Sequence, residues 1–168
     1  MAKTIISFFA VLILVCVCTN SVSQNDVISR NRISVIRAYK SQIGVREKTG
    51  HNDGKDVEKY LKTVGLGKGN PWCAAFVKWC LLQGGITEAN RINGMALSTE
   101  RPAGFVYTRG RFLGSPRPAD VFTLYYKRLG RIGHTGFVHG WASKQNGSIL
   151  TVEGNTNDGG SRDGDGVY

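Results

Sequence analysis

The chain has 168 residues, of which 41% are hydrophobic and 20% charged, and its formal net charge at pH 7 is +10. This length suits one domain with a single core, and the sequence contains no internal repeat, linker or second domain. Although the charge is strongly basic, no stretch resembles a nucleic-acid-binding motif, so a nucleic-acid partner is not expected.

Residues 1–23 have the pattern of a secretory signal peptide. Lys3 gives a positive start, an apolar run of 14 residues follows from Ile5 to Cys18, and small residues at Ser21 and Ser23 suit a signal peptidase. The run is too short to span a bilayer comfortably, so we expect cleavage before Gln24 and export rather than a permanent membrane anchor. The mature domain is then residues 24–168.

Export narrows the set of anionic partners, and cleavage of the signal peptide leaves two cysteines in the mature chain. Removing Lys3 leaves 21 basic and 12 acidic side chains, and seven of the basic ones lie between Arg101 and Arg131. Outside the cell, the anions available to such a surface are cell-wall polymers and lipid head groups. The mature chain keeps only Cys73 and Cys80, which are about 10 Å apart along one predicted helix and cannot form a disulfide.

Two amphipathic helices are predicted in the first half of the mature chain. The first covers 26–43 and ends at Gly44. The second carries an apolar stripe at i, i+3, i+4 and i+7, formed by Val57, Tyr60, Leu61 and Val64. The intervening segment 52–56 faintly resembles a calcium loop, but Lys55 interrupts it, so we favour a turn leading into the helix and expect no metal or other cofactor.

The third predicted helix is the centre of the chain. Asn70 is expected to cap it and Pro71 to occupy its first position, which places Cys73 in the first turn. The positive end of the helix dipole favours a thiolate there, and the thiolate is the nucleophilic form of cysteine. The helix is apolar on nearly every side except at Lys78, so it should run through the core, with Cys80 packed inside. A plain buried cysteine is the alternative interpretation of Cys73.

Strands are predicted in the second half of the chain. They follow a Gly- and Arg-rich region in which a short helix at 88–97 and a short strand at 105–107 are expected. The predicted strands cover 119–126, 133–141, 148–153 and 164–168. Helices followed by antiparallel strands indicate an α+β domain.

A histidine and an acid accompany the cysteine. In the strand 133–141, the period of two places His134, Gly136 and Val138 on one face and His139 on the other. Glu153 ends the next strand, where it can accept the proton on the far nitrogen of His134 and fix its tautomer, the third role in a catalytic triad. A structural histidine and simple turn chemistry near 155–160 are the alternatives.

These segments resemble a CHAP domain (cysteine, histidine-dependent amidohydrolase/peptidase) of the papain-like NlpC-type group. The resemblance rests on residues 71–77, 118–122, 133–138 and 152–155, and extends upstream to 43–47 and 52–61. It implies a papain-like fold, with the cysteine helix packed on an antiparallel sheet. It also implies that Cys73 is the nucleophile, His134 the base and acid, Glu153 the orienting acid, and Asn155 a supporting polar group.

The resulting hypothesis is a secreted cysteine amidase or peptidase that hydrolyses an amide bond in peptidoglycan, either the muramoyl–alanine bond or one within the stem or cross-bridge peptide. We expect Trp72, Asn52 and Gly136 to contact the substrate, Gly136 because it leaves the backbone beside His134 uncluttered. The main alternative is a non-catalytic wall- or glycan-binding module that has kept the fold. Many phage lysins carry a separate wall-binding domain; we expect none in this sequence and expect the basic surface to serve in its place.

Overall fold

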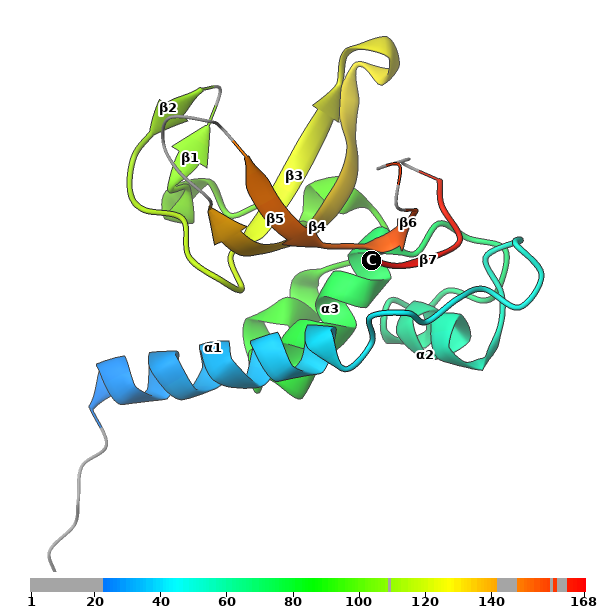
Figure 1. Ribbon diagram of the computed structural model, residues 1–168, viewed down its shortest axis with the longest axis horizontal. Helices are drawn as coiled ribbons and strands as arrows, with labels where there is room; N and C mark the ends of the chain where they lie inside the picture. The colour runs from blue at the N-terminus through cyan, green and yellow to red at the C-terminus, as the bar shows by residue number, and fades with distance from the viewer. Residues whose placement is uncertain (1–22, 109, 142–147, 158, 160–162) are drawn as a thin grey trace, which may run out of the picture.

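The computed structural model describes residues 23–108, 110–141, 148–157, 159 and 163–168. The predicted signal peptide lies outside the described residues, except for Ser23. The described part is an α+β fold in which helices lie beneath a three-stranded antiparallel sheet (Figure 1). This confirms the fold class expected from the order of helices and strands. A search of the described residues finds no helix that is both long and apolar enough to cross a membrane.

The first two helices form close to their predicted positions. Helix α1, Gln24–Lys40, begins after Ser23, whose hydroxyl accepts a hydrogen bond from the Asp26 amide as an N-cap. It ends at Lys40 rather than at residue 43, because the chain tightens into a turn before Gly44. Helix α2, Lys55–Thr63, buries Val57, Tyr60 and Leu61 of the predicted stripe, and the fourth member, Val64, follows the helix as its C-cap.

Helix α3, Cys73–Gln83, runs through the core as expected, but the predicted cap is wrong. Trp72 holds the N-cap position, and the Phe76 amide donates the first helical hydrogen bond to the Trp72 carbonyl. The Asn70 side chain instead donates to the Gly67 carbonyl, so it is committed to the preceding loop. Cys73 is therefore the first helical residue, and its amide belongs to the set that lacks a partner within the helix.

The central sheet has the strand order β3-β4-β5 and is antiparallel throughout. Its strands are β3, Val121–Tyr126; β4, Arg131–Trp141; and β5, Ile149–Val152. Two pairs of very short strands accompany it: β1, Tyr107–Thr108, with β2, Arg111–Phe112, and β6, Gly154–Thr156, with β7, Gly166–Val167. The segment between α3 and β1 forms 3-10 helices rather than one α-helix: η1, Thr87–Arg91; η2, Ala96–Thr99; and η3, Pro102–Gly104. A fourth, η4, Lys127–Leu129, joins β3 to β4.

The two faces of the sheet have different surroundings. Phe137 of β4 stacks on Tyr39 of α1 and meets Phe76 of α3 edge-on, so this face packs on the helices. Val121 and Val152, which pair with Phe137 in the register, share that face and join the core. His134 and Gly136 pair with Leu124 and Phe122 and project from the opposite face.

A buried lysine attaches the η1 segment to the central helix. Lys78 of α3 is 7% exposed, and its Nζ donates hydrogen bonds to the carbonyls of Asn90 at 3.1 Å and Ile92 at 2.9 Å. Because a buried ammonium must be matched by acceptors, these bonds hold the end of η1 on α3. Lys78, the single charged residue of α3, thus has a structural role: it attaches the η1 segment to the helix.

Candidate active site

Cys73 and Cys80 occupy different environments although both are free thiols. Cys73 is 5% exposed at the first position of α3, where the helix amides point outward. Cys80 is fully buried two turns deeper, and burial raises the pKa of its thiol well above the usual value. Of the two, only Cys73 lies where a substrate could reach a sulfur.

His134 and Glu153 form a tight pair. The Nε2 atom of His134 lies 2.7 Å from Oε2 of Glu153, and the other carboxylate oxygen, Oε1, accepts a 2.6 Å hydrogen bond from the Thr151 hydroxyl. Both oxygens of Glu153 are therefore fixed, one by His134 of β4 and the other by Thr151 of β5. Thr151 has no assigned role in the sequence-based hypothesis, although the period of two does place it on the face of Glu153.

The charges of this pair favour an imidazolium next to a carboxylate. Burial lowers the pKa of His134, but the interactions with Cys73 and Glu153 raise it by more. The pKa is therefore about 9, compared with an ordinary value of 6.5. Burial raises the pKa of Glu153, but the bonds to His134 and Thr151 outweigh this effect and lower it overall. Between these two pKa values both groups are charged, which is the state that a proton donor to a leaving amine needs.

The second ring nitrogen of His134 is available for the cysteine. His134 is 1% exposed, and its Nδ1 atom is buried without a hydrogen bond to any described residue. Interactions with the Cys73 side chain raise the pKa of the ring, so the sulfur and the imidazole are neighbours. The ring is thus held on one side by Glu153 and open on the other to Cys73.

The second histidine of the strand has a different partner. Nδ1 of His139 lies 2.8 Å from the hydroxyl of Tyr39 in α1, and the two rings meet edge-on. His139 therefore faces α1, on the side of Phe137, while His134 interacts with Cys73 and Glu153. The alternation in the sequence separates the two histidines correctly.

Gly136 makes room for the acid rather than for a substrate. A Cβ atom at this buried position would lie 2.8 Å from Cγ of Glu153 and 3.0 Å from the Phe122 ring, so a side chain would displace Glu153. Gly154 is similar, since a Cβ there would lie 2.7 Å from Phe76 and Trp72. The next residue, Asn155, is 1% exposed with a left-handed backbone at φ 60°, and β6 thus lies against the start of α3.

Trp72 and Asn52 are joined through Glu47, a residue to which the sequence pattern gives no role. Trp72 is fully buried, stacks on Tyr60, and donates from Nε1 to Oε1 of Glu47 at 2.8 Å. The other oxygen of Glu47 accepts a 2.8 Å bond from the Asn52 amide. The Trp72 ring therefore has no surface for a substrate, whereas Asn52 lines a cavity of about 250 Å³ with Glu47, Asn157 and Gly164.

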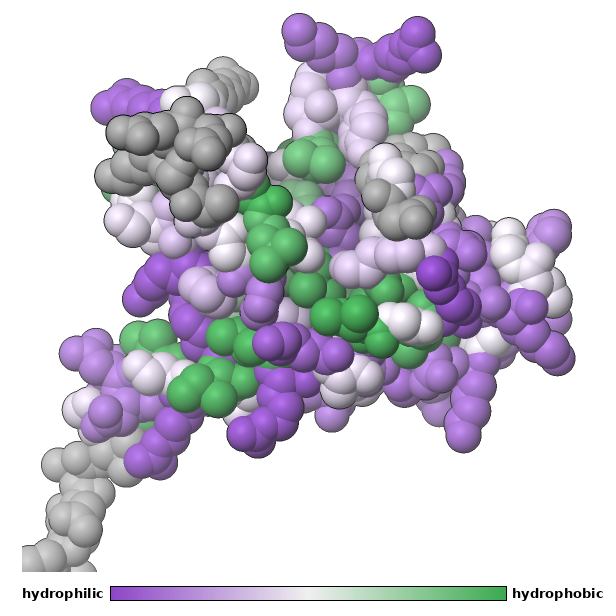
Figure 2. Space-filling model, viewed as in Figure 1, coloured by the Kyte–Doolittle hydropathy of each residue, from purple (hydrophilic) through white to green (hydrophobic). Residues whose placement is uncertain are grey.

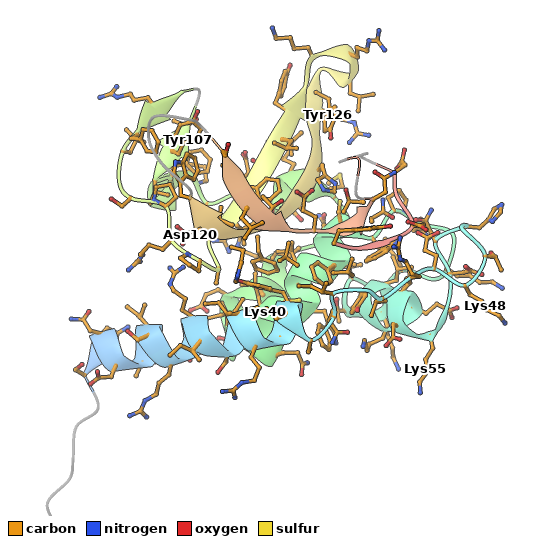
Figure 3. The ribbon with its side chains drawn as sticks, in the orientation of Figure 1. Lys40, Lys48, Lys55, Tyr107, Asp120 and Tyr126 are labelled. Carbon is orange, nitrogen blue, oxygen red and sulfur yellow. The ribbon has the colours of Figure 1, made fainter. Side chains whose placement is uncertain are left out.

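A second and larger cavity, of about 1160 Å³, adjoins the His134–Glu153 pair. Its walls include Glu153 and Thr151, the sheet residues Phe122 and Leu124, and aromatic side chains such as Tyr107. Figure 3 places Tyr107 on the β1–β2 side of the molecule, across from the β3–β4 hairpin that carries Tyr126. The apolar walls of this cavity end at an ionised carboxylate, an arrangement that fits a binding site next to reacting groups.

The segment that faintly resembles a calcium loop is occupied by internal bonds. Asp53 accepts hydrogen bonds from the amide and the hydroxyl of Thr49, and these bonds lower the pKa of its carboxyl. Across the described ranges, no group of three or more His, Cys, Asp or Glu side chains is placed to hold a metal ion.

Comparison with known proteins gives one match. The sequence model of the CHAP domain matches residues 65–155, more than half of the chain, and the matched range includes Cys73, His134, Glu153 and Asn155. No curated protein and no solved structure matches significantly.

Proposed function

We propose, from the premise that this chain belongs to the CHAP domain family, that it is a secreted cysteine amidase or endopeptidase acting on peptidoglycan. CHAP domains are generally cysteine- and histidine-dependent amidohydrolases, and their family suggests a peptidoglycan-hydrolase-type function. The single observation that carries the proposal is the His134 ring, bonded to Glu153 at 2.7 Å and acted on by Cys73.

The first step is attack on an amide carbonyl. The Cys73 sulfur, as thiolate, forms a bond to the carbonyl carbon, and the carbonyl electrons move onto oxygen. The backbone amide of Cys73 is a donor for this oxyanion, because the first amides of α3 have no partner within the helix. Asn155, buried beside the start of α3, is proposed as a supporting polar group.

The second step expels the amine and then releases the acid. His134, charged because Glu153 stabilises the imidazolium, gives its Nδ1 proton to the leaving nitrogen, and a thioester to Cys73 remains. Neutral His134 then takes a proton from water as the water attacks the thioester, which frees the carboxylic acid and restores the Cys73 thiolate beside a charged His134. Glu153 stays ionised throughout and holds the ring by its Nε2 hydrogen.

The test uses purified peptidoglycan, with mass spectrometry of the new ends to identify the bond that is cleaved. Cys73→Ala should remove turnover, and His134→Ala should lower kcat by roughly 10²–10⁴-fold. A Cys73→Ala/His134→Ala double variant should be no worse than Cys73→Ala alone, because the residues act as one unit. His139→Ala is the matched control, since His139 bonds Tyr39 instead, and it should keep its activity.

A binding module is the competing function, and the same assay separates the two. If the wild-type protein sediments with peptidoglycan but produces no new ends, the chain is a wall-binding module. Export is tested separately, by sequencing the N-terminus of the protein made in its own host. A start at or near Gln24 is expected, and a retained Met1 would contradict export with cleavage.

A further inference from the structure

The tip of the β3–β4 hairpin carries large apolar side chains together with cations. Its tip, residues 124–131, lies where β3 passes through η4 into β4. Leu124, Tyr125 and Leu129 are 43%, 64% and 43% exposed. Figure 1 shows the hairpin projecting from the body of the molecule, away from α1. Large apolar side chains are thus partly exposed at the end of a projecting element.

The charge of the hairpin has one sign. Lys127, Arg128 and Arg131 are exposed, and residues 121–141 contain no aspartate or glutamate. Within the described residues, none of these three cations makes an ion pair with the protein. Figure 2 shows a strongly hydrophilic end above a paler stem at this projection. These three charges therefore face the solvent.

The presence of both apolar and cationic side chains at the tip favours one class of anionic partner over another. A charged polymer in water would use the cations but would gain nothing from exposed leucines. A bilayer uses both, because Leu and Tyr enter the interface while Lys and Arg contact anionic head groups. We propose that the hairpin tip docks the protein on an anionic phospholipid bilayer.

Docking at this tip has a consequence for the site. Leu124, Tyr125 and Ile132 of the hairpin also line the large cavity whose walls include Glu153, and Leu124 pairs with His134 in the register. A bilayer that holds the tip therefore lies beside the cavity that adjoins the proposed catalytic groups. The enzyme would then act on substrate close to the membrane rather than throughout the wall.

The first experiment measures binding of the full chain to vesicles by sedimentation. Binding is expected to phosphatidylcholine vesicles that contain phosphatidylglycerol and not to pure phosphatidylcholine. Each cation near an anionic surface contributes about fivefold, so Lys127→Gln/Arg128→Gln/Arg131→Gln should weaken binding by roughly 100-fold. The matched control, Arg30→Gln/Arg37→Gln/Lys40→Gln on α1, removes the same charge from the other side of the molecule and should change binding little.

The apolar side chains decide between a bilayer and a soluble polyanion. Tyr125→Ser/Leu129→Ser should weaken vesicle binding by about tenfold and leave binding to polyphosphate unchanged. If this variant binds vesicles like the wild type, or if control and tip variants lose binding equally, the membrane proposal is overturned. A loss confined to polyphosphate would instead identify a polymer site and also overturn it.

A fluorescent reporter at the tip tests insertion without removing any apolar or cationic side chain of the tip except Tyr125, which becomes another aromatic residue. Tyr125→Trp should show a blue-shifted emission and quenching by brominated lipid when anionic vesicles are added, whereas Ile33→Trp on α1 should show neither. An unshifted emission from the Tyr125→Trp variant with bound vesicles would contradict insertion of the tip. Because Cys73→Ala should bind vesicles normally, failure of this proposal and failure of the catalytic one give different results.

Discussion

The interaction between Glu153 and His134 makes a measurable prediction about protonation. In Glu153→Gln the side chain keeps its shape but loses the charge that lies 2.7 Å from Nε2. The pKa of His134, about 9 in the native protein, should fall by roughly 1–3 units, because an opposite charge at this distance has effects of that size. A titration of the three histidines by NMR, assigned with His51→Ala and His139→Ala, measures this change directly.

The same pKa sets how stability depends on pH. The folded protein holds the His134 proton more tightly than the unfolded chain, whose pKa for histidine is near 6.5. The difference corresponds to roughly 3 kcal/mol, which is fully present below pH 6.5 and is lost as pH rises through about 9. Denaturant unfolding of the wild type should therefore show the free energy of unfolding falling across this interval.

In the Glu153→Gln variant, the free energy of unfolding should depend much less on pH across this interval. Glu153→Gln should be less stable than the wild type at pH 6 and nearly equal to it at pH 10, because neutral His134 gains little from the carboxylate. If His134 titrates near pH 9 in both proteins, Glu153 does not stabilise the imidazolium and the proposed role of this acid is refuted. Cys73→Ala, measured in parallel, reports how much of the raised pKa comes from the sulfur.

Three further results are expected. Brief alkylation with iodoacetamide at neutral pH should label Cys73 well before Cys80, which is fully buried; peptide mapping showing the reverse order would mean that the nucleophile is wrongly assigned. Lys78→Met should lower the free energy of unfolding by about 1–3 kcal/mol, because two carbonyls lose their donor, and an unchanged melting curve would contradict this structural role. EDTA should leave hydrolysis intact, since Asp53 is engaged by Thr49; restoration by calcium after inactivation would contradict this.

Much of the fold was predictable because its signals are local. The stripe on α2 and the alternation on β4 follow from periodicity alone, and both elements appear where the pattern places them. The start of α3 was not predictable in this way. Asn70 and Pro71 form a good local cap signal, yet the helix begins at Cys73, because the buried Trp72 ring is fixed by Tyr60 and Glu47. Such distant contacts override a local preference.

The residues of the candidate site likewise include some that the sequence predicts and one that only the fold reveals. Cys73, His134 and Glu153 each carry a chemical signal in the sequence, and the structure brings His134 into contact with Glu153 and under the influence of Cys73. Glu47 carries no such signal. Its importance comes from a bond to an indole 25 residues away in the sequence and another to the Asn52 amide, and only the folded chain brings these groups together.

The sequence singles out Gly136, but the fold gives a different reason for the glycine. Its missing side chain suggests space for a substrate beside His134. In the fold that space is filled by Cγ of Glu153 and the ring of Phe122, at 2.8 Å and 3.0 Å from where a Cβ would lie. The glycine is therefore needed because the acid must cross over the neighbouring strand to reach Nε2 of His134. The position of the Glu153 side chain is thus set by the residue two places after His134 as much as by Glu153 itself.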